Sequence, residues 1–458
     1  MFPLFPNKLT AKGSMLLFVM VFGAIAFTTV VLTVAGYAVT EMQASRSKQN
    51  REGAMEVADA GISYYRWHLA HNSTDYRDGN PTSTPSPYVH DYKDKDGNVI
   101  GHFALTITPP PIGSTVVTIQ SQGWLDVQPN SKRTIKARVG FPSLADYSFL
   151  TNGAIWIGST ESTHGKFHSN GGVRYDGTND AQVMSAVATY TCPTWQGCSG
   201  NPTKPGIWGA GGPANLWVFP VPAKDFAAVT AKLAEIKAGA LADGGGNWPY
   251  LSSSGQKGWR LQFMNNGTVA VSKVLTCNNY SGQDTNGKNS TWCIDAASYG
   301  AVTTYNIPTS SYIYVDDMVW VDGVVNGKAT IGAGTGKSII INGNLTYLAK
   351  DGTSVLGLIA EQNVLVPHNS PNNLEIDAAM IAQNGAVERY YYAGNTKNSI
   401  LVYGAIITNQ TWTWSWNDPV NSGYVNTNST YDANLTYGPP PGFPVGSSYN
   451  LISWEEVH

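Results

Sequence analysis

The segment from Ser14 to Thr40 reads SMLLFVMVFGAIAFTTVVLTVAGYAVT and contains no Asp, Glu, Lys or Arg. As an α-helix it would span about 40 Å, more than the roughly 30 Å hydrocarbon core of a bilayer. A secretory signal has an apolar stretch of only about 7–15 residues, although Gly36-Tyr37-Ala38 also fits a signal-peptidase site. The sequence therefore predicts a membrane-crossing helix over residues 14–40, with a cleaved secretory signal as the alternative.

A helical pattern continues beyond this apolar segment. From Glu41 to about His71 the residues stay compatible with a helix, and apolar side chains recur at steps of three and four. Such a stripe is typical of a helix that packs on a globular body. Its members are Met55, Ala58, Ile62, Tyr65 and Leu69. We therefore expect one long helix, apolar in its first half and amphipathic from residue 41.

Four β-strands are predicted after this helix and a linker-like segment at residues 81–87. Asp96-Gly97 is a strong signal for a tight hairpin between the first two strands. The fourth strand alternates apolar and charged residues, which predicts one buried and one solvated face. The expected strands are residues 88–92, 101–108, 115–125 and 133–141. Residues 41–143 should thus form an α+β domain with an antiparallel sheet.

The remainder of the chain, residues 144–458, has a different sequence pattern. Short apolar strands broken by Gly and Asn recur about every ten to twenty residues, which suits strands stacked by turns. The pattern predicts an irregular right-handed β-helix, or solenoid, with a β-sandwich or jelly roll as the alternative. A helical insertion near residues 222–242 is also expected, because apolar residues share one helical face there. They are Phe226, Val229, Leu233, Ile236 and Ala240.

The composition fits a turn-rich β protein. Charged residues make up 13% of the chain, about half the usual share. The 48 Gly and 25 Pro argue against a helical bundle, and the 11% aromatic residues argue against disorder. The formal net charge is −3. Without a basic bias, nucleic acid is not expected among the partners.

Four cysteines lie in two local pairs, Cys192 with Cys198 and Cys277 with Cys293. Four cysteines allow three pairings, and proximity favours this one. Neither spacing suits a zinc site, which needs short C-x₂₋₄-C pairs or histidine partners. We predict two disulfides and hence an oxidising, extracytoplasmic compartment, with four reduced thiols as the alternative.

The N-terminus resembles that of type IV pilin precursors. Lys12-Gly13 precedes a small residue, Ser14, and the apolar helix, and residues 54–62 (AMEVADAGI) are similar to the end of the N-terminal segment of PilX-type minor pilins. The resemblance implies a leader at residues 1–13 that prepilin peptidase removes by cutting between Gly13 and Ser14. It also implies that the helix and four strands form a pilin-type α/β roll, joined here to a large β-rich surface module.

One position departs from the pilin pattern. Pilins usually carry Glu at the fifth mature position, and Phe18 stands there. That Glu neutralises the N-terminal amine of a neighbouring subunit, so its absence implies a minor or tip subunit. The implied partners are other pilin subunits, prepilin peptidase and, before assembly, the cytoplasmic membrane. The bulk of the chain would lie outside, at the cell surface or on a pilus.

Several motifs suggest chemistry, but each has a structural explanation. Gly332–Ser338 is one residue short of a phosphate-binding loop and precedes a strand-like segment. His164 and His168 have metal-ligand spacing but lie in a turn-rich stretch without a third ligand nearby in sequence. Asp94–Gly97 fits a hairpin turn better than a calcium loop. We therefore predict no catalytic, cofactor-binding or metal-binding residue, no cofactor and no enzymatic activity.

Three carboxylates support an alternative function. Asp316, Asp317 and Asp322 would supply an acid and a base if the chain were a membrane-anchored β-helix enzyme acting on polysaccharide, because such enzymes use paired carboxylates. We expect these residues instead in turns on the solvated side of the β-rich module.

The most suggestive surface feature is the run TWTWSW at residues 411–416. As a strand it would place Trp412, Trp414 and Trp416 on one face, since side chains alternate along a strand. The three indoles are a candidate contact for a polysaccharide or another cell-surface ligand. We favour instead a buried role, in which the indoles cap the open end of the solenoid or pack under the tail at residues 438–442.

The resulting hypothesis is a pilin-like structural protein, a minor or tip subunit of a type IV pilus-like filament that presents an extracellular β-rich module for adhesion. The alternatives are the membrane-anchored enzyme and a passive coat protein of the cell surface.

Overall fold

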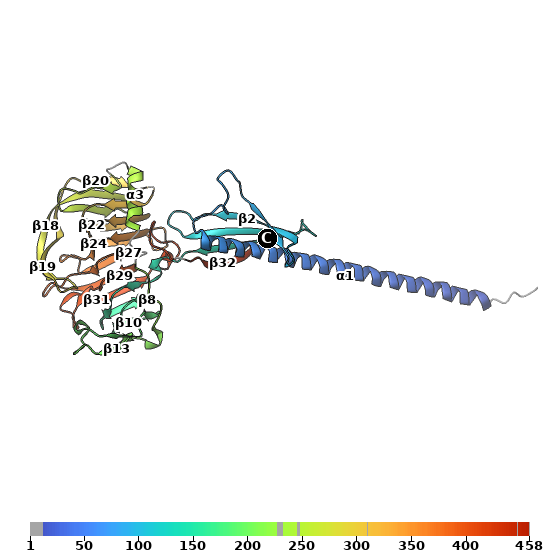
Figure 1. The fold of residues 1–458 in the computed structure, drawn as a ribbon, viewed down its shortest axis with the longest axis horizontal. Helices are drawn as coiled ribbons and strands as arrows, with labels where there is room; N and C mark the ends of the chain where they lie inside the picture. The colour runs from blue at the N-terminus through green and yellow to red at the C-terminus, as the bar shows by residue number, and fades with distance from the viewer. Residues whose placement is uncertain (1–11, 227–231, 245–247, 309, 447, 458) are drawn as a thin grey trace, which may run out of the picture. The chain divides into compact units, whose positions relative to one another are not determined.

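The computed structural model describes residues 12–226, 232–244, 248–308, 310–446 and 448–457 of the 458-residue chain. The chain divides into two compact units. The first comprises Met1–Thr108, Thr118–Arg138 and Leu451–His458, and the second comprises Pro109–Val117 and Val139–Asn450. The chain therefore builds most of the first unit, then the second, and returns to the first with its last strand (Figure 1).

One uninterrupted helix, α1 (Lys12–His71), accounts for 60 residues, as predicted. Its first half is exposed, and its length and composition are sufficient to cross a membrane. Its second half buries one face on the sheet of the first unit, beside β2 (Figure 1). The buried residues are Ala54, Val57, Ala58, Ile62, Tyr65 and Leu69. Met55 of the predicted stripe is only half-buried.

The sheet of the first unit has five strands in the order β1-β2-β3-β4-β32. Four of them match the predicted strands within two residues, and β1–β2 and β2–β3 pair antiparallel. The fifth, β32, comes from the extreme C-terminus, a stretch that we had kept within residues 144–458. Its glutamates form ion pairs with β4, between Glu456 and Arg133 and between Glu455 and Lys136. The bounds are β1 (Tyr88–Lys93), β2 (Val99–Thr108), β3 (Val116–Leu125), β4 (Arg133–Gly140) and β32 (Asn450–Val457).

The second unit is built mainly from short β-strands, as predicted, and most of them join one sheet of 22 strands. Its first strands are β5 (Phe149–Thr151), β6 (Ile155–Ile157), β7 (Glu161–His164), β8 (Phe167–Ser169), β9 (Val173–Tyr175), β10 (Thr178–Asn179), β11 (Val183–Ser185), β12 (Thr189–Thr191), β13 (Thr203–Pro205), β14 (Ile207–Trp208), β15 (Trp217–Val218), β16 (Tyr250–Leu251) and β17 (Gly258–Phe263). The later ones are β18 (Thr268–Gln283), β19 (Asn289–Tyr299), β20 (Thr303–Asn306), β21 (Tyr312–Val315), β22 (Val319–Val325), β23 (Lys328–Ala333), β24 (Ile339–Tyr347), β25 (Val355–Ala360), β26 (Val364–Leu365), β27 (Asn373–Ala382), β28 (Val387–Glu388), β29 (Thr396–Thr408), β30 (Ser415–Trp416) and β31 (Ser422–Tyr431). Four 3₁₀ turns accompany them, η1 (Leu144–Asp146), η2 (Thr194–Gln196), η3 (Ala214–Leu216) and η4 (Ala433–Leu435).

Two runs of parallel pairing organise the large sheet. One runs through β21, β23, β25, β27 and β29, and the other through β17, β22, β24, β26 and β28. The first run then departs from sequence order, because β29 pairs with β5, β5 with β8, β8 with β11 and β11 with β15. The chain thus enters this ladder in its middle, and its early strands extend the ladder beyond the last long one.

The core of the second unit contains side chains stacked at the same register from strand to strand. One such row runs through eight buried residues, each paired with the next across the ladder. Burying a row of this kind supplies the main driving force for stacking strands that are individually too short to be stable. The row consists of Ile313, Ile331, Leu358, Met380, Ile406, Phe149, Phe167 and Val183.

The helix α3 (Lys232–Gly244) lies within the predicted helical insertion. Its buried residues Leu233, Ile236 and Ala240 belong to the predicted apolar face, and they pack with Tyr314 and Ile359 of the large sheet. Part of the predicted insertion, residues 227–231, lies outside the described residues.

Candidate functional site

Both predicted disulfides are present. The Cα atoms of Cys192 and Cys198 lie 5.9 Å apart, and those of Cys277 and Cys293 lie 5.3 Å apart. These separations are within the usual range for disulfides. The second bond links the paired strands β18 and β19, whereas the first closes a tight surface loop around η2.

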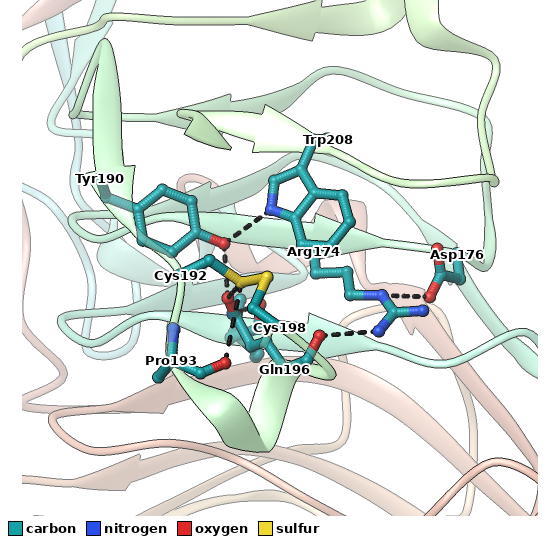
Figure 2. The surroundings of a disulfide bond; sticks show 9 residues. Arg174, Asp176, Tyr190, Cys192, Pro193, Gln196, Cys198 and Trp208 are labelled. Carbon is teal, nitrogen blue, oxygen red and sulfur yellow. Dashed lines mark hydrogen bonds and ion pairs between the residues drawn. A yellow bond between two sulfur atoms is a disulfide. The ribbon is translucent and has the colours of Figure 1, made fainter. Parts of the chain in front are cut away.

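The loop Cys192–Cys198 is anchored from beneath by one buried amide. Gln196, at the end of η2, points inward and is fully buried. Its Nε2 donates to the carbonyl oxygen of Ile155 at 2.6 Å, and its Oε1 accepts from the hydroxyl of Tyr190 at 2.5 Å. Figure 2 shows this arrangement around the disulfide. A covalent closure, one buried and one partly buried hydrogen bond therefore hold the loop in one conformation.

Aromatic and cationic side chains alternate beside this loop. Arg174 lies over the ring of Trp156 at 4.3 Å and over that of Trp208 at 5.3 Å, and Lys204 lies over the same Trp208 ring at 4.6 Å. Arg174 also pairs with Asp176 at 2.7 Å and donates to a carbonyl of the disulfide loop at 2.7 Å (Figure 2). Cation–π contacts of this kind contribute about 0.5–1 kcal/mol each at exposed sites.

The exposed aromatic side chain of the loop is Trp195, which is 46% accessible to solvent. An indole held on a pre-organised loop offers a large contact area and loses little conformational entropy on binding. Our sequence analysis missed this residue, although a tryptophan between two closely spaced cysteines was visible. The loop and its neighbours Trp156, Arg174, Lys204 and Trp208 are called the tryptophan patch below.

The tryptophan run at residues 411–416 is not the surface that we proposed. Trp412 and Trp414 are 4% and 0% exposed, and Trp416 is half-buried. Only Ser415–Trp416 is a strand, so the three indoles do not share a strand face. Trp412 packs edge-on against Phe149 of β5 at 5.0 Å. Because β5 lies between β29 and β8 in the ladder, the two buried indoles belong to its core and do not cap an end.

The three candidate carboxylates each have separate partners. Asp316 pairs with Lys237 at 3.0 Å, and Asp322 receives two hydrogen bonds of 2.9 Å from Arg260. Asp317 is buried and accepts hydrogen bonds from a serine amide and hydroxyl at 2.9 and 2.7 Å. Burial raises the pKa of Asp317, but these hydrogen bonds outweigh it and hold the pKa below its ordinary value. The contacts are those of structural residues.

The other motifs also have structural roles. His164 pairs with Asp180 at 2.8 Å, while His168 is buried in β8 with Asn170 at 3.0 Å, and burial lowers the pKa of His168. Within the described ranges, no group of three or more His, Cys, Asp or Glu side chains could hold a metal ion. Within Gly332–Ser338, the first two residues end β23 and residues 334–338 connect it to β24 through a turn. Gly13 and Ser14 lie at the start of α1, and their cleavage stays a prediction.

A pocket in the second unit is a further candidate site that we did not predict. It lies between the turn before β7 and the segment around β30, and its volume is about 50 Å³. Glu161 is only 6% exposed within it, and burial, with a smaller effect of Asp418, raises the pKa of Glu161 to about 7. The lining residues are Trp156, Gly158, Ser159, Thr160, Glu161, Thr413, Ser415, Asn417, Asp418 and Val420. Its two walls are far apart in sequence, so no local pattern could reveal it.

No protein-family model matches this chain, and no curated protein matches it. Among solved structures, the chain is similar to the competence-associated pilin ComZ from Thermus thermophilus, at 14% sequence identity and a TM-score of 0.29. The similarity covers 89% of this chain and 97% of that one. A TM-score this low does not establish a common fold.

Proposed function

We propose that this chain is a pilin-like structural subunit that carries a large β-rich module for surface contact. The observation that supports this most directly is α1, a single helix whose first half is apolar and exposed and whose second half packs on a small sheet. Such a helix can lie in the cytoplasmic membrane before assembly and among neighbouring helices afterwards. The proposal includes no enzymatic step.

The subunit is proposed to be a minority or tip component. An N-terminal amine buried among apolar helices costs several kcal/mol unless it is paired. With Phe18 in place of an acid, this chain cannot neutralise the Ser14 amine of another copy. We therefore expect it to assemble with Glu-bearing pilin subunits or above them, with its bulk on the outside of the cell.

The β-rich module is proposed to be an irregular β-helix. The two runs of parallel pairing support this, because sandwiches and jelly rolls pair their strands antiparallel. Side chains stacked at one register across successive strands support it as well. The tryptophan patch, on the small sheets β14-β9-β6 and β12-β13 and on the loop around η2, is the proposed contact with a polysaccharide or another cell surface.

Processing by prepilin peptidase tests the first part of the proposal. Co-expression with the peptidase should give a mature chain that begins at Ser14, and Gly13→Leu should block the cut because the bulky side chain sits at the scissile bond. Mass spectrometry of the N-terminal peptide reads the result. Gly23→Leu, inside the apolar helix, is the control and should be cut normally. A mature N-terminus near Val39 would indicate a secretory signal and contradict a pilin-like anchor.

Binding through the tryptophan patch tests the second part. Trp195→Ala should reduce retention of the full-length protein on insoluble cellulose or chitin at least tenfold. Its melting temperature should stay unchanged, because truncation of an exposed side chain usually costs less than about 0.5 kcal/mol. Trp67→Ala removes an indole that is 60% exposed on α1 and should bind normally. Equal retention of Trp195→Ala and the wild type would exclude the patch as the adhesive surface.

A further inference from the structure

The pocket between the turn before β7 and the segment around β30 contains two carboxylates and no cationic side chain. Its floor carries Glu161, and Asp418 at its exposed mouth accepts a hydrogen bond of 2.9 Å from the hydroxyl of Ser159. We propose that this pocket binds a calcium ion. The site shares Trp156 with the tryptophan patch and is independent of the pilin-like role proposed above.

Glu161 supplies the first reason. More than nine-tenths of this residue is buried, and it accepts one hydrogen bond, from the Gly158 amide to Oε2 at 2.8 Å. In the described part of the chain no group donates to its Oε1, although the side chain lines the pocket. A buried carboxylate is costly unless a charge or several hydrogen bonds compensate it. The described residues give this carboxylate one hydrogen bond and no cationic partner, and a bound cation would complete its coordination.

The size of the pocket is the second reason. A cavity needs about 10–15 Å³ in this measure to hold one water molecule, so one of about 50 Å³ accommodates an ion with a few waters. Trp156 and several hydroxyls form the walls.

The donor atoms of the pocket side chains are the third reason. Apart from Trp156, the polar side chains that line the pocket offer oxygen atoms as possible metal ligands, from two carboxylates, four hydroxyls and one amide. They belong to Glu161, Asp418, Ser159, Thr160, Thr413, Ser415 and Asn417. Oxygen donors select hard cations, and calcium accepts irregular sets of carboxylate, carbonyl and hydroxyl oxygens, whereas magnesium requires a near-ideal octahedron. With only two carboxylates, we expect a dissociation constant on the order of 10⁻⁴–10⁻³ M, as in extracellular calcium modules.

Thermal melting of the full-length protein in detergent tests the site. The transition of the second unit should shift upward with calcium chloride, saturate at millimolar concentration at pH 7.5, and respond less to magnesium chloride. Glu161→Gln should abolish this shift, and Asp418→Asn should weaken calcium binding at least tenfold. Asp351→Asn, a change of a fully exposed carboxylate elsewhere in the unit, should respond like the wild type.

Terbium luminescence detects the ion directly and does not depend on stability. Terbium replaces calcium, and Trp156 in the pocket wall would sensitise its emission. Excitation of tryptophan should give terbium emission that calcium displaces, and Glu161→Gln should lose it. A wild type with neither a calcium-induced shift nor displaceable emission would overturn the proposal, as would a Glu161→Gln variant that keeps both. An equal response to magnesium would overturn the assignment to calcium.

Discussion

Replacing Trp414 with alanine should lower the free energy of unfolding of the second unit by about 3–5 kcal/mol, the range for a buried tryptophan. Trp414 is fully buried and packs edge-on against Trp412, which packs against Phe149 in turn. Phe149 is stacked on Phe167 of the next strand, with ring centroids 5.0 Å apart. The indole thus supports the place where the early strands join the end of the long parallel run, and neighbouring aromatic rings cannot collapse into the cavity that alanine leaves.

Urea unfolding monitored by hydrogen exchange of peptides from β5, β29 and β31 measures this loss. Trp195→Ala is the matched control, because it removes an exposed indole from the same unit and should change stability by less than about 0.5 kcal/mol. A Trp414→Ala variant with native stability and lost surface binding would contradict the burial described here and restore the run as a binding face. A loss of 3–5 kcal/mol is a large part of the 5–15 kcal/mol that stabilises a typical domain.

The elements predicted well from sequence are those set by local periodicity. The 3–4 spacing of apolar residues defines α1 and the buried face of α3, and Asp96-Gly97 marks the hairpin between β1 and β2. Both disulfides join cysteines that are close in sequence, so proximity was sufficient. In these elements few long-range interactions compete with the local conformational preferences, so the preferences of the sequence agree with the fold.

The tryptophan run shows where the local pattern fails. Alternation of Trp with hydroxyl residues fits a strand with one aromatic face, yet the backbone forms a strand only at Ser415–Trp416. The pattern is the same for a solvated face and for a core face, because burial depends on what packs opposite. Here Phe149, far away in sequence, covers Trp412.

The other features that could not be predicted from sequence depend on pairing between segments that are far apart in the chain. The stretch NLISWEEV in β32 has the composition of a strand, but its place beside β4 depends on backbone pairing with a distant strand, which two ion pairs accompany. The place of β5 next to β29 is equally non-local, because the order of strands in a sheet depends on which distant segments pair. The pocket around Glu161 also needs two distant segments and so leaves no motif.

Gly123→Ala should separate the second half of α1 from its sheet. A Cβ atom at this position in β3 would lie 2.4 Å from the carbonyl oxygen of Ala54 and 2.4 Å from the amide nitrogen of Ala58. Both are backbone atoms of the helix, so no side-chain rotation relieves the clash, and the helix must move. Overpacking usually costs about 1–3 kcal/mol, and we expect about 3 kcal/mol or more here because the obstacle is rigid.

Gly61→Ala in the same interface is the informative comparison. Its Cβ would meet Ser121 Oγ at 2.3 Å and Phe103 Cδ2 at 2.8 Å, which are side-chain atoms that can shift. Alanine also favours the helix by about 1 kcal/mol over glycine, so the net loss should be smaller than in Gly123→Ala. Hydrogen exchange of residues 50–71 in the full-length protein should therefore accelerate strongly in Gly123→Ala and less in Gly61→Ala. Equal protection in the two variants would mean that the helix does not depend on a close approach to β3.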